Sequence, residues 1–327
     1  MGGEALLRSV GLAIAALALA LGVGEVALRL LGVAPGSPAA ASDWGRDDAI
    51  LGWTNRPGVG HPSEPGHVPM TFWPDGQRAS SPAPKLDARR RVVVVGCSFT
   101  QGFGVADAET FTWRLNETYP DVRFENWGVG GYSTYQSLLL LERLLRAPGP
   151  KPDLVVYGFI GDHVRRNLAK LRYVQQLKSA RGLFVVPPSV GLESDALAEH
   201  PARVVAPWPS EQSVAWTRVL HGAWLWLHEH RQRNRDDVLA TNLLIERMDR
   251  EVREAGARLL VAILSDLPSR TDAFLAEQKI AAVNCIVPGY PGDPSFQVGG
   301  VGHPSGRLHA LWSECVRRAL DAQGLLR

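Results

Sequence analysis

The stretch RVVVVGCSFTQGFG, residues 91–104, carries the strongest indication of the fold. Four consecutive valines are typical of a strand that is buried on both faces, as in a parallel sheet. A glycine turn follows at Gly96, and Ser98 stands just beyond it, where the chain leaves the strand. Ligands of open α/β sheets bind beyond the carboxyl ends of the strands. The segment therefore predicts a central strand and a candidate site at its end.

On both sides of this strand, short apolar segments alternate with amphipathic ones. Strand–helix alternation of this kind predicts an α/β fold, a three-layer sandwich around a mostly parallel sheet. Further strands are expected at 122–126, 154–159, 258–264 and 281–287. Helices are expected at 107–118, 134–146, 214–232, 236–255 and 305–325, the last with Ser305 as its N-cap.

The composition excludes several classes of protein. The chain has 327 residues, of which 45% are hydrophobic and 21% charged, and its net charge is +2. This is ordinary for a globular protein with one large or two small domains, and it lacks the basic excess of a nucleic-acid binder. Three distant cysteines exclude a disulfide-rich scaffold and any CxxC motif. Cys285 and Cys315 can pair in an oxidising compartment or remain thiols, and the sequence leaves this open.

The N-terminus predicts a membrane segment. Residues 9–24 (SVGLAIAALALALGVG) carry no charge, and apolar character resumes after Glu25. This is just long enough for a spanning helix, which needs about 20 apolar residues. Arg8 favours a cytoplasmic N-terminus, while Arg29 on the other side weakens that preference. The alternatives are a cleaved signal peptide, whose nearest small-residue site at 39–41 is too far downstream, and a buried helix. An anchor or a signal peptide would place the rest outside the cytoplasm.

The composition of the chain changes along its length and suggests several parts. The expected parts are an anchor (1–32), a linker with an irregular segment packed on the main body (33–90), and a main domain (91–327) with an insertion near 168–213. Aromatic residues at Trp44, Trp53 and Trp73 favour packing of the irregular segment. The insertion is expected beside the site or at a partner surface. The tryptophans at 216, 224 and 226 are expected to pack the insertion or its helix and not to form a sugar platform.

Glycine turns and one histidine follow the other predicted strands. NWGVGGY begins at residue 126, IGDH at 160 and GHPS at 302, which places His303 just before the last helix. A lone loop histidine is more often a surface residue. Together, however, a serine, a histidine and two glycine turns form the set that serine acyl transfer needs: nucleophile, base and oxyanion donors. The segment after Gly96 is neither a P-loop nor a GxSxG or GxGxxG motif.

Four segments, in this order and spacing, resemble the SGNH/GDSL hydrolase superfamily over residues 91–327. They are GCSFTQGFGVADAETF, NWGVGGYST, PDLVVYGFIGDH and GHPSGRLH. The early LGWTNRPG and WPDGQR segments, with the N-terminal anchor, are similar to a membrane-anchored bacterial branch of it. The resemblance implies a flavodoxin-like sandwich, a serine nucleophile at Ser98 and a general base at His303. It also implies oxyanion donors at the backbone of Ser98 and Gly131 and in the third block at Gly161, and no metal or cofactor.

The chain departs from that family pattern at three places. The family's aspartate before the serine is Cys97 here, and its third-block asparagine aligns with Gly161, which has no side chain. Asp162 or His163 are the candidates to compensate, although a carboxylate would repel an oxyanion and Asp162 can equally cap a turn. The aspartate before the catalytic histidine is absent, since positions 300 and 301 are glycine and valine. A backbone carbonyl or Asp293 would then orient the histidine, or the enzyme works as a dyad.

The sequence thus favours a membrane-anchored, extracytoplasmic serine esterase. It would cleave or transfer an acyl group through acyl-Ser98, on a cell-envelope glycan or lipid ester. One alternative is an O-acetyltransferase of exported polysaccharide, which would use the same residues. Another is a catalytically inactive carbohydrate-binding or assembly protein. The expected partners are the ester substrate, the membrane and envelope polysaccharide machinery, with no nucleic acid.

Overall fold

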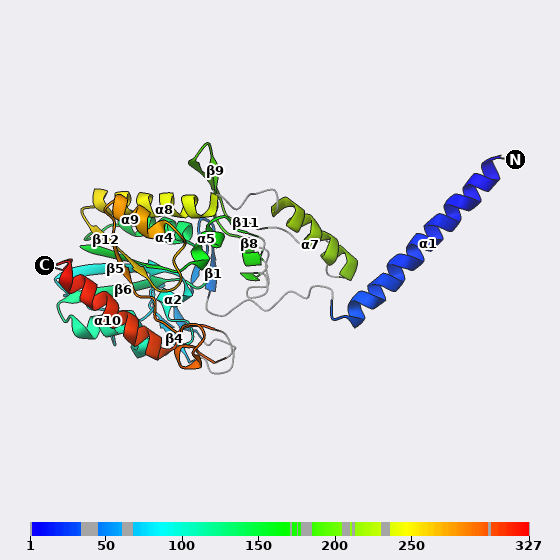
Figure 1. Cartoon of the computed structure of the whole chain (residues 1–327). Coiled ribbons are helices and arrows are strands. Elements are labelled where there is room, and N and C mark those ends of the chain that lie inside the picture. Colours follow the sequence, from blue (N-terminus) through cyan, green and yellow to red (C-terminus); the bar gives the residue numbers. More distant parts are fainter. Residues whose placement is uncertain are drawn as a thin grey trace.

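The structure is a computed structural model that describes residues 2–33, 45–60, 68–170, 172–174, 176–177, 185–204, 210, 213–229, 236–299 and 302–326. Figure 1 shows a long N-terminal helix, a second helix near its end, and a layered α/β body that carries the C-terminus. Most of the predicted linker, Trp44 and positions 300 and 301 lie outside the described residues.

The body is built on a five-stranded sheet in which every neighbouring pair of strands is parallel. The order across the sheet is β13-β12-β7-β5-β6. All four valines at 92–95 lie in β5, and none is exposed to solvent. The predicted parallel sheet and its doubly buried strand are confirmed. The strands are β5 (Arg90–Gly96), β6 (Val122–Gly128), β7 (Leu154–Phe159), β12 (Arg258–Ile263) and β13 (Ala281–Asn284).

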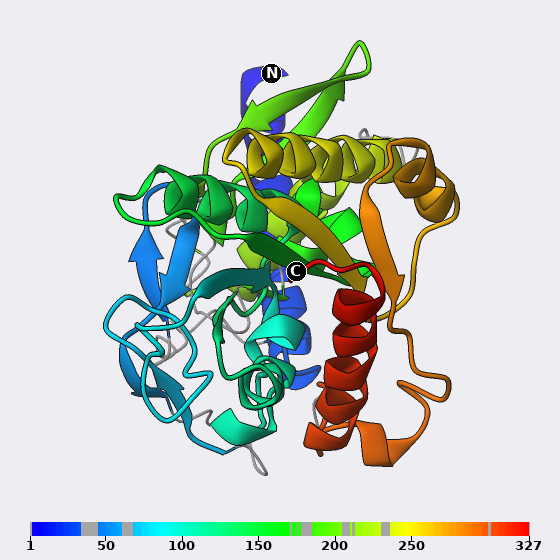
Figure 2. The ribbon, with the colours of Figure 1, turned by 90° about the vertical axis from the view of Figure 1, so that its left-hand side faces the viewer.

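Helices cover both faces of the sheet, which makes the three layers visible in Figure 2. Val92 and Val94 pack in one apolar core with α3 and α10, and Val93 and Val95 pack in the other with α4 and α8. This follows because successive side chains of a strand point to opposite faces. The predicted sandwich is confirmed. The covering helices are α3 (Phe111–Thr118), α4 (Thr134–Arg146), α8 (Asp236–Glu254) and α10 (Gly306–Ala322).

Several short elements were not expected from the sequence. The helix expected at 107–118 breaks at Thr110, whose side chain caps α3 by accepting from the backbone N–H of Trp113 (3.2 Å). Residues read as loop after β7 form a helix, and another helix precedes β13. These elements are α2 (Ser98–Gln101), η1 (Asp107–Glu109), α5 (Asp162–Asn167), α9 (Thr271–Glu277) and η3 (Pro294–Phe296).

Antiparallel hairpins also occur where no strands were expected. Two lie before the main sheet and two in the expected insertion, where β9 and β10 lie beside α8 (Figure 1). Their strands have two to five residues, which is too short for alternation to reveal them. They are β1 (Gly45–Asp48), β2 (Gly52–Asn55), β3 (Gly58–Gly60), β4 (Met70–Phe72), β8 (Val185–Val186), β9 (Ser189–Glu193), β10 (Ala196–His200) and β11 (Arg203–Val204).

The N-terminal helix α1 (Gly2–Leu30) projects away from the body (Figure 1). Its segment Leu6–Leu30 is long and apolar enough to cross a membrane, by length and composition, and it is not buried inside the protein. The alternative of a buried core helix is therefore wrong. An anchor and a signal sequence both fit this helix. The helix α7 (Ala215–Glu229) lies near the end of α1 (Figure 1).

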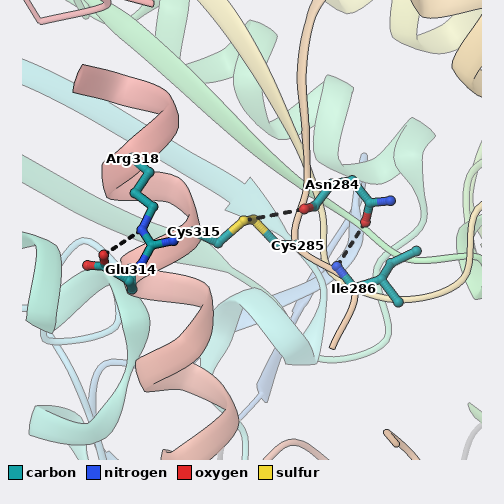
Figure 3. Close-up of a disulfide and its surroundings, with 6 residues drawn as sticks. All are labelled: Asn284, Cys285, Ile286, Glu314, Cys315 and Arg318. Carbon is teal, nitrogen blue, oxygen red and sulfur yellow. Dashed lines mark hydrogen bonds and ion pairs between the residues drawn. A yellow bond between two sulfur atoms is a disulfide. The ribbon is translucent and has the colours of Figure 1, made fainter. Parts of the chain in front are cut away.

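A disulfide joins Cys285, just after β13, to Cys315 in α10 (S–S 1.99 Å; Figure 3). Cys97 is a buried free thiol. Structural disulfides persist in oxidising compartments, so the bond and the N-terminal apolar helix together suggest a secretory route for the chain. The bond also ties the last helix, which follows His303, to the edge of the sheet.

Candidate active site

Ser98 is the first residue of α2, directly beyond the end of β5. Three glycines form one row across the strand ends, since Gly96 pairs in register with both Gly128 and Gly158. A Cβ on Gly128 would stand 2.7 Å from the Cα of Gln101, and one on Gly96 would stand 2.9 Å from the Cβ of Thr100. Such contacts are too close for real Cβ atoms. The glycine row therefore lets α2 sit directly on the strand ends and sets the position of Ser98.

The structure brings Ser98 and His303 together across 205 positions of sequence. The Nε2 atom of His303 lies 3.1 Å from Ser98 Oγ, within hydrogen-bond distance. Only 6% of Ser98 is exposed. The ring of His303 contacts the rings of Phe99 and Phe103, with centroids 6.0 and 4.8 Å away. A pair in this geometry has the arrangement of a nucleophile and its base.

The loop that carries His303 is held from two sides. The His303 carbonyl accepts a hydrogen bond from the backbone N–H of Val298 (2.7 Å). The hydroxyl of Tyr290 donates to the carbonyl of Gly302 (2.9 Å). These two hydrogen bonds fix the backbone at Gly302 and His303, from which the ring reaches Ser98.

The glycine turn after β6 is braced by the segment that precedes the main sheet. Trp53 donates from its indole to the carbonyl of Gly130 (2.9 Å), and Tyr132 donates to the carbonyl of Trp53 (2.6 Å). The hydroxyl of Tyr173 donates to the carbonyl of Gly131 (2.5 Å), a residue with φ +81°, which favours glycine. The predicted oxyanion turn is thus bonded on both sides, and the donor role of Gly131 stays a prediction.

The third predicted donor position is occupied differently from the family pattern. A Cβ on Gly161 would stand 2.5 Å from the Cγ of Asp266, an exposed residue in the loop after β12. A carboxylate therefore lies where a side chain of residue 161 would begin. Sequence reasoning missed Asp266 because no spacing links it to Gly161. Its position two residues beyond the apolar end of a strand was the one available signal.

Neither Asp162 nor His163 is placed to replace the missing side-chain donor at position 161. Asp162 pairs with Arg165 (2.7 Å) and with Arg166 (3.4 Å) on α5. His163 is fully buried, and its Nδ1 lies 2.7 Å from the hydroxyl of Tyr157. Burial holds the pKa of His163 well below its usual value, so the ring is neutral. A residue with no solvent exposure does not reach a substrate, and His163 is therefore a core residue.

Arg166 is a second residue that sequence reasoning missed. Its guanidinium donates to the carbonyl of Tyr132 (3.1 Å), beside the predicted oxyanion turn. It also lies beside the thiol of Cys97, the neighbour of Ser98: burial raises the pKa of this thiol, and the nearby cation opposes that rise. Its spacing four residues after Asp162 on one helix was the available signal. A positive charge thus stands behind the turn that carries the candidate nucleophile.

Asp293 is engaged in its own turn. Its Oδ1 accepts from the backbone N–H of Ser295 (2.8 Å) at the start of η3. This hydrogen bond holds the pKa of the Asp293 carboxyl below its usual value. Ser305 occupies the predicted N-cap position of α10, but its side chain accepts no hydrogen bond from the helix, and its hydroxyl donates to the carbonyl of Ser295 (2.8 Å). The orienting role considered for Asp293 stays a prediction.

Within the part of the chain that the structure describes, no group of three or more His, Cys, Asp or Glu side chains is arranged to hold a metal ion.

No family model matches this chain, and no curated protein matches it. Among solved structures, TesA is similar over 71% of this chain and 99% of its own, at 19% identity and a TM-score of 0.42. The psychrotrophic esterase EstA from Pseudoalteromonas sp. matches over 72% and 98%, at 10% identity and 0.42. AlinE4, a SGNH-hydrolase family esterase, matches over 72% and 93%, at 13% identity and 0.38. Values this low assign no activity or substrate to this chain.

Proposed function

We propose that this chain is a serine ester hydrolase of the SGNH type, which works through an acyl-Ser98 intermediate. The observation that carries the proposal is the 3.1 Å approach of His303 Nε2 to Ser98 Oγ. The glycine row that seats Ser98 and the braced turn at Gly131 support it.

In the first half-reaction, Ser98 Oγ bonds to the carbonyl carbon of the ester while His303 takes the hydroxyl proton. The tetrahedral intermediate collapses, the bond to the alcohol oxygen breaks, and His303 returns its proton to the leaving alcohol. Water then repeats the sequence on the acyl-enzyme and releases a carboxylic acid and free Ser98. The backbone N–H groups of Ser98 and Gly131 are the proposed donors to the oxyanion.

Gly161 bears on the rate of this reaction. It supplies no side-chain amide, and the carboxylate of Asp266 lies beside it. Loss of one oxyanion donor typically costs about 2.7–4 kcal/mol of barrier, or roughly 10²–10³ in kcat. We therefore expect slow turnover compared with a site that has a third donor.

For localisation, we propose that the catalytic body lies outside the cytoplasm and that α1 is a single-pass anchor. The disulfide between Cys285 and Cys315 and the apolar span of α1 support this. An ester of an envelope glycan or lipid, such as an acetyl ester, is the proposed substrate. It rests on this location and on the family resemblance.

A fluorophosphonate probe tests the proposal, because it phosphonylates an activated serine and the adduct is located by mass spectrometry. We expect labelling at Ser98 and its loss in the Ser98→Ala and His303→Ala variants. Ser81→Ala is the matched control. The hydroxyl of Ser81 donates a hydrogen bond to the carbonyl of Ala83, and labelling of Ser98 should persist in this variant.

Unlabelled protein that melts like the wild type would reject the esterase and leave a binding or assembly protein. Labelled protein that acetylates a glycan acceptor faster than it hydrolyses the ester would instead favour the O-acetyltransferase.

A further inference from the structure

Glu25 of α1 is bonded to the start of α7, 190 positions later in the chain. Its Oε1 accepts from the backbone N–H of Ala215 (2.9 Å) and its Oε2 from that of Trp216 (3.1 Å). The first N–H groups of a helix have no partner within the helix, and a carboxylate there also complements the helix dipole. The only acidic side chain in the apolar span Leu6–Leu30 therefore caps another helix.

The side chains of Arg29 and Trp216 make further contacts at this junction. Arg29 pairs with Glu25 (2.8 Å) and donates to the carbonyl of Ser213 (2.8 Å). The indole of Trp216 donates to the carbonyl of Leu21 (3.0 Å), and a Cβ on Gly24 would stand 2.5 Å from that indole ring. Trp216 thus packs against α1 at Gly24 and reaches Leu21, one turn deeper into the apolar span than Glu25.

The face of α7 that begins with Trp216 continues as an exposed apolar stripe. Leu220, Trp224 and Leu227 follow it at spacings of four, four and three residues, so they share one side of the helix. They are 55%, 45% and 57% exposed. Because Trp216 contacts α1 toward its apolar interior, the stripe faces the same side as the apolar part of α1.

Figure 1 shows α7 between the end of α1 and the body, with its axis running across that of α1. We propose that α7 is an interfacial helix that lies in the surface of the lipid bilayer spanned by α1, with Leu220, Trp224 and Leu227 in the acyl boundary. The occupant of this apolar face is thus lipid. The argument for it is that the face is continuous with the one helix, among the described residues, that can cross a membrane.

Two consequences follow for the molecule. The Glu25 cap joins α1 to α7, so the proposal requires that α1 be retained in the mature protein and not be cleaved as a signal sequence. The helix α7 then sets how the body sits over the bilayer, because it connects the end of α1 to the fold. This inference concerns the membrane surface alone and holds whether or not Ser98 is a nucleophile.

Depth-dependent quenching in vesicles tests the proposal on the full chain. The variants Leu220→Cys and Leu227→Cys receive a thiol-reactive NBD dye; the native cysteines do not compete, since Cys97 is buried and the other two are bonded. In phosphatidylcholine vesicles with spin-labelled lipid, we expect several-fold stronger quenching at these positions than at Arg218→Cys, the matched control on the opposite side of α7. Equal quenching at all three positions would overturn the proposal.

Three further measurements complete the test. In the Leu220→Cys background, Glu25→Ala should reduce quenching at position 220 while the protein stays in the vesicles, because the cap is lost and the span is kept. The intact mass of the protein should correspond to a chain that still contains α1. A mature mass that starts beyond the span would refute the retained anchor. Cross-linking of position 220 to a second copy without lipid quenching would show a protein interface in place of lipid.

Discussion

Replacement of glycine by alanine should have different consequences at two positions of the candidate site, Gly128 and Gly161. A Cβ on Gly128 would meet the backbone of α2, 2.7 Å from the Cα of Gln101 and 2.8 Å from the carbonyl carbon of Thr100. The three atoms nearest to a Cβ on Gly161 would all belong to the carboxylate end of Asp266, whose Cγ would lie 2.5 Å away. Asp266 is exposed and can rotate away, whereas the backbone that follows Ser98 has to shift as a whole.

The magnitudes follow from this difference. Ordinary van der Waals contact of a Cβ begins near 3.4 Å, so Gly128→Ala has to push α2 outward from the strand ends. Overpacking of this kind costs about 1–3 kcal/mol of stability. A displacement of about 1 Å at a reacting group can lower turnover roughly 10²-fold. For Gly161→Ala we expect a stability change within about 0.5 kcal/mol, as for an ordinary surface change, and turnover close to wild type.

Urea denaturation gives the stability of each variant, and hydrolysis of p-nitrophenyl acetate gives its turnover. Fluorophosphonate titration gives the concentration of reactive sites. Dividing the rate by this concentration keeps unfolded protein from lowering the apparent turnover. If Gly128→Ala keeps wild-type stability and turnover, or if Gly161→Ala is the more damaging change, the glycine row does not position Ser98 as argued above.

Three other predictions concern the oxyanion site, pH and the disulfide. Gly161→Asn combined with Asp266→Ala should raise kcat on a soluble ester above that of Asp266→Ala alone, by up to about 10²–10³, because an amide donor enters the vacated space; no increase would mean that residue 161 does not face the oxyanion. Burial lowers the pKa of His309 to about 3, so unfolding takes up a proton below about pH 6.5, and the stability present above that pH falls as pH drops toward 3, by at most about 2 kcal/mol at pH 5. Urea midpoints should show this fall, and His309→Asn should reduce it without abolishing it, because burial also lowers the pKa of His163. Reducing the bond between Cys285 and Cys315, which closes a loop of 30 residues, should cost about 3–4 kcal/mol of stability on the chain-entropy account. Melting temperatures with and without reductant measure this cost. The Cys315→Ser variant, which lacks the bond, should melt at the same temperature in both conditions.

The elements that local pattern could predict are those with a long, one-sided signal. Four valines predicted β5, and the segment 154–159 predicted β7 with the bounds that the structure has. The helices at 134–146 and 236–255 were predicted within one residue, because their apolar stripes are long. The hairpins and α5 were missed, since segments of two to six residues carry too little periodicity to be recognised.

By itself the sequence determined the class of the fold, the apolar N-terminal helix and the position of Ser98 in a turn beyond a buried strand. Each of these follows from neighbouring residues, through burial, hydropathy and the freedom of glycine. Only the tertiary structure decided that His303 meets Ser98, that Asp266 lies beside Gly161 and that Glu25 caps α7. These contacts join residues about 100 to 205 positions apart, and their geometry depends on strand order and on how helices pack over the sheet. No local sequence pattern encodes the strand order, because the order is selected by the burial of apolar residues from the whole chain.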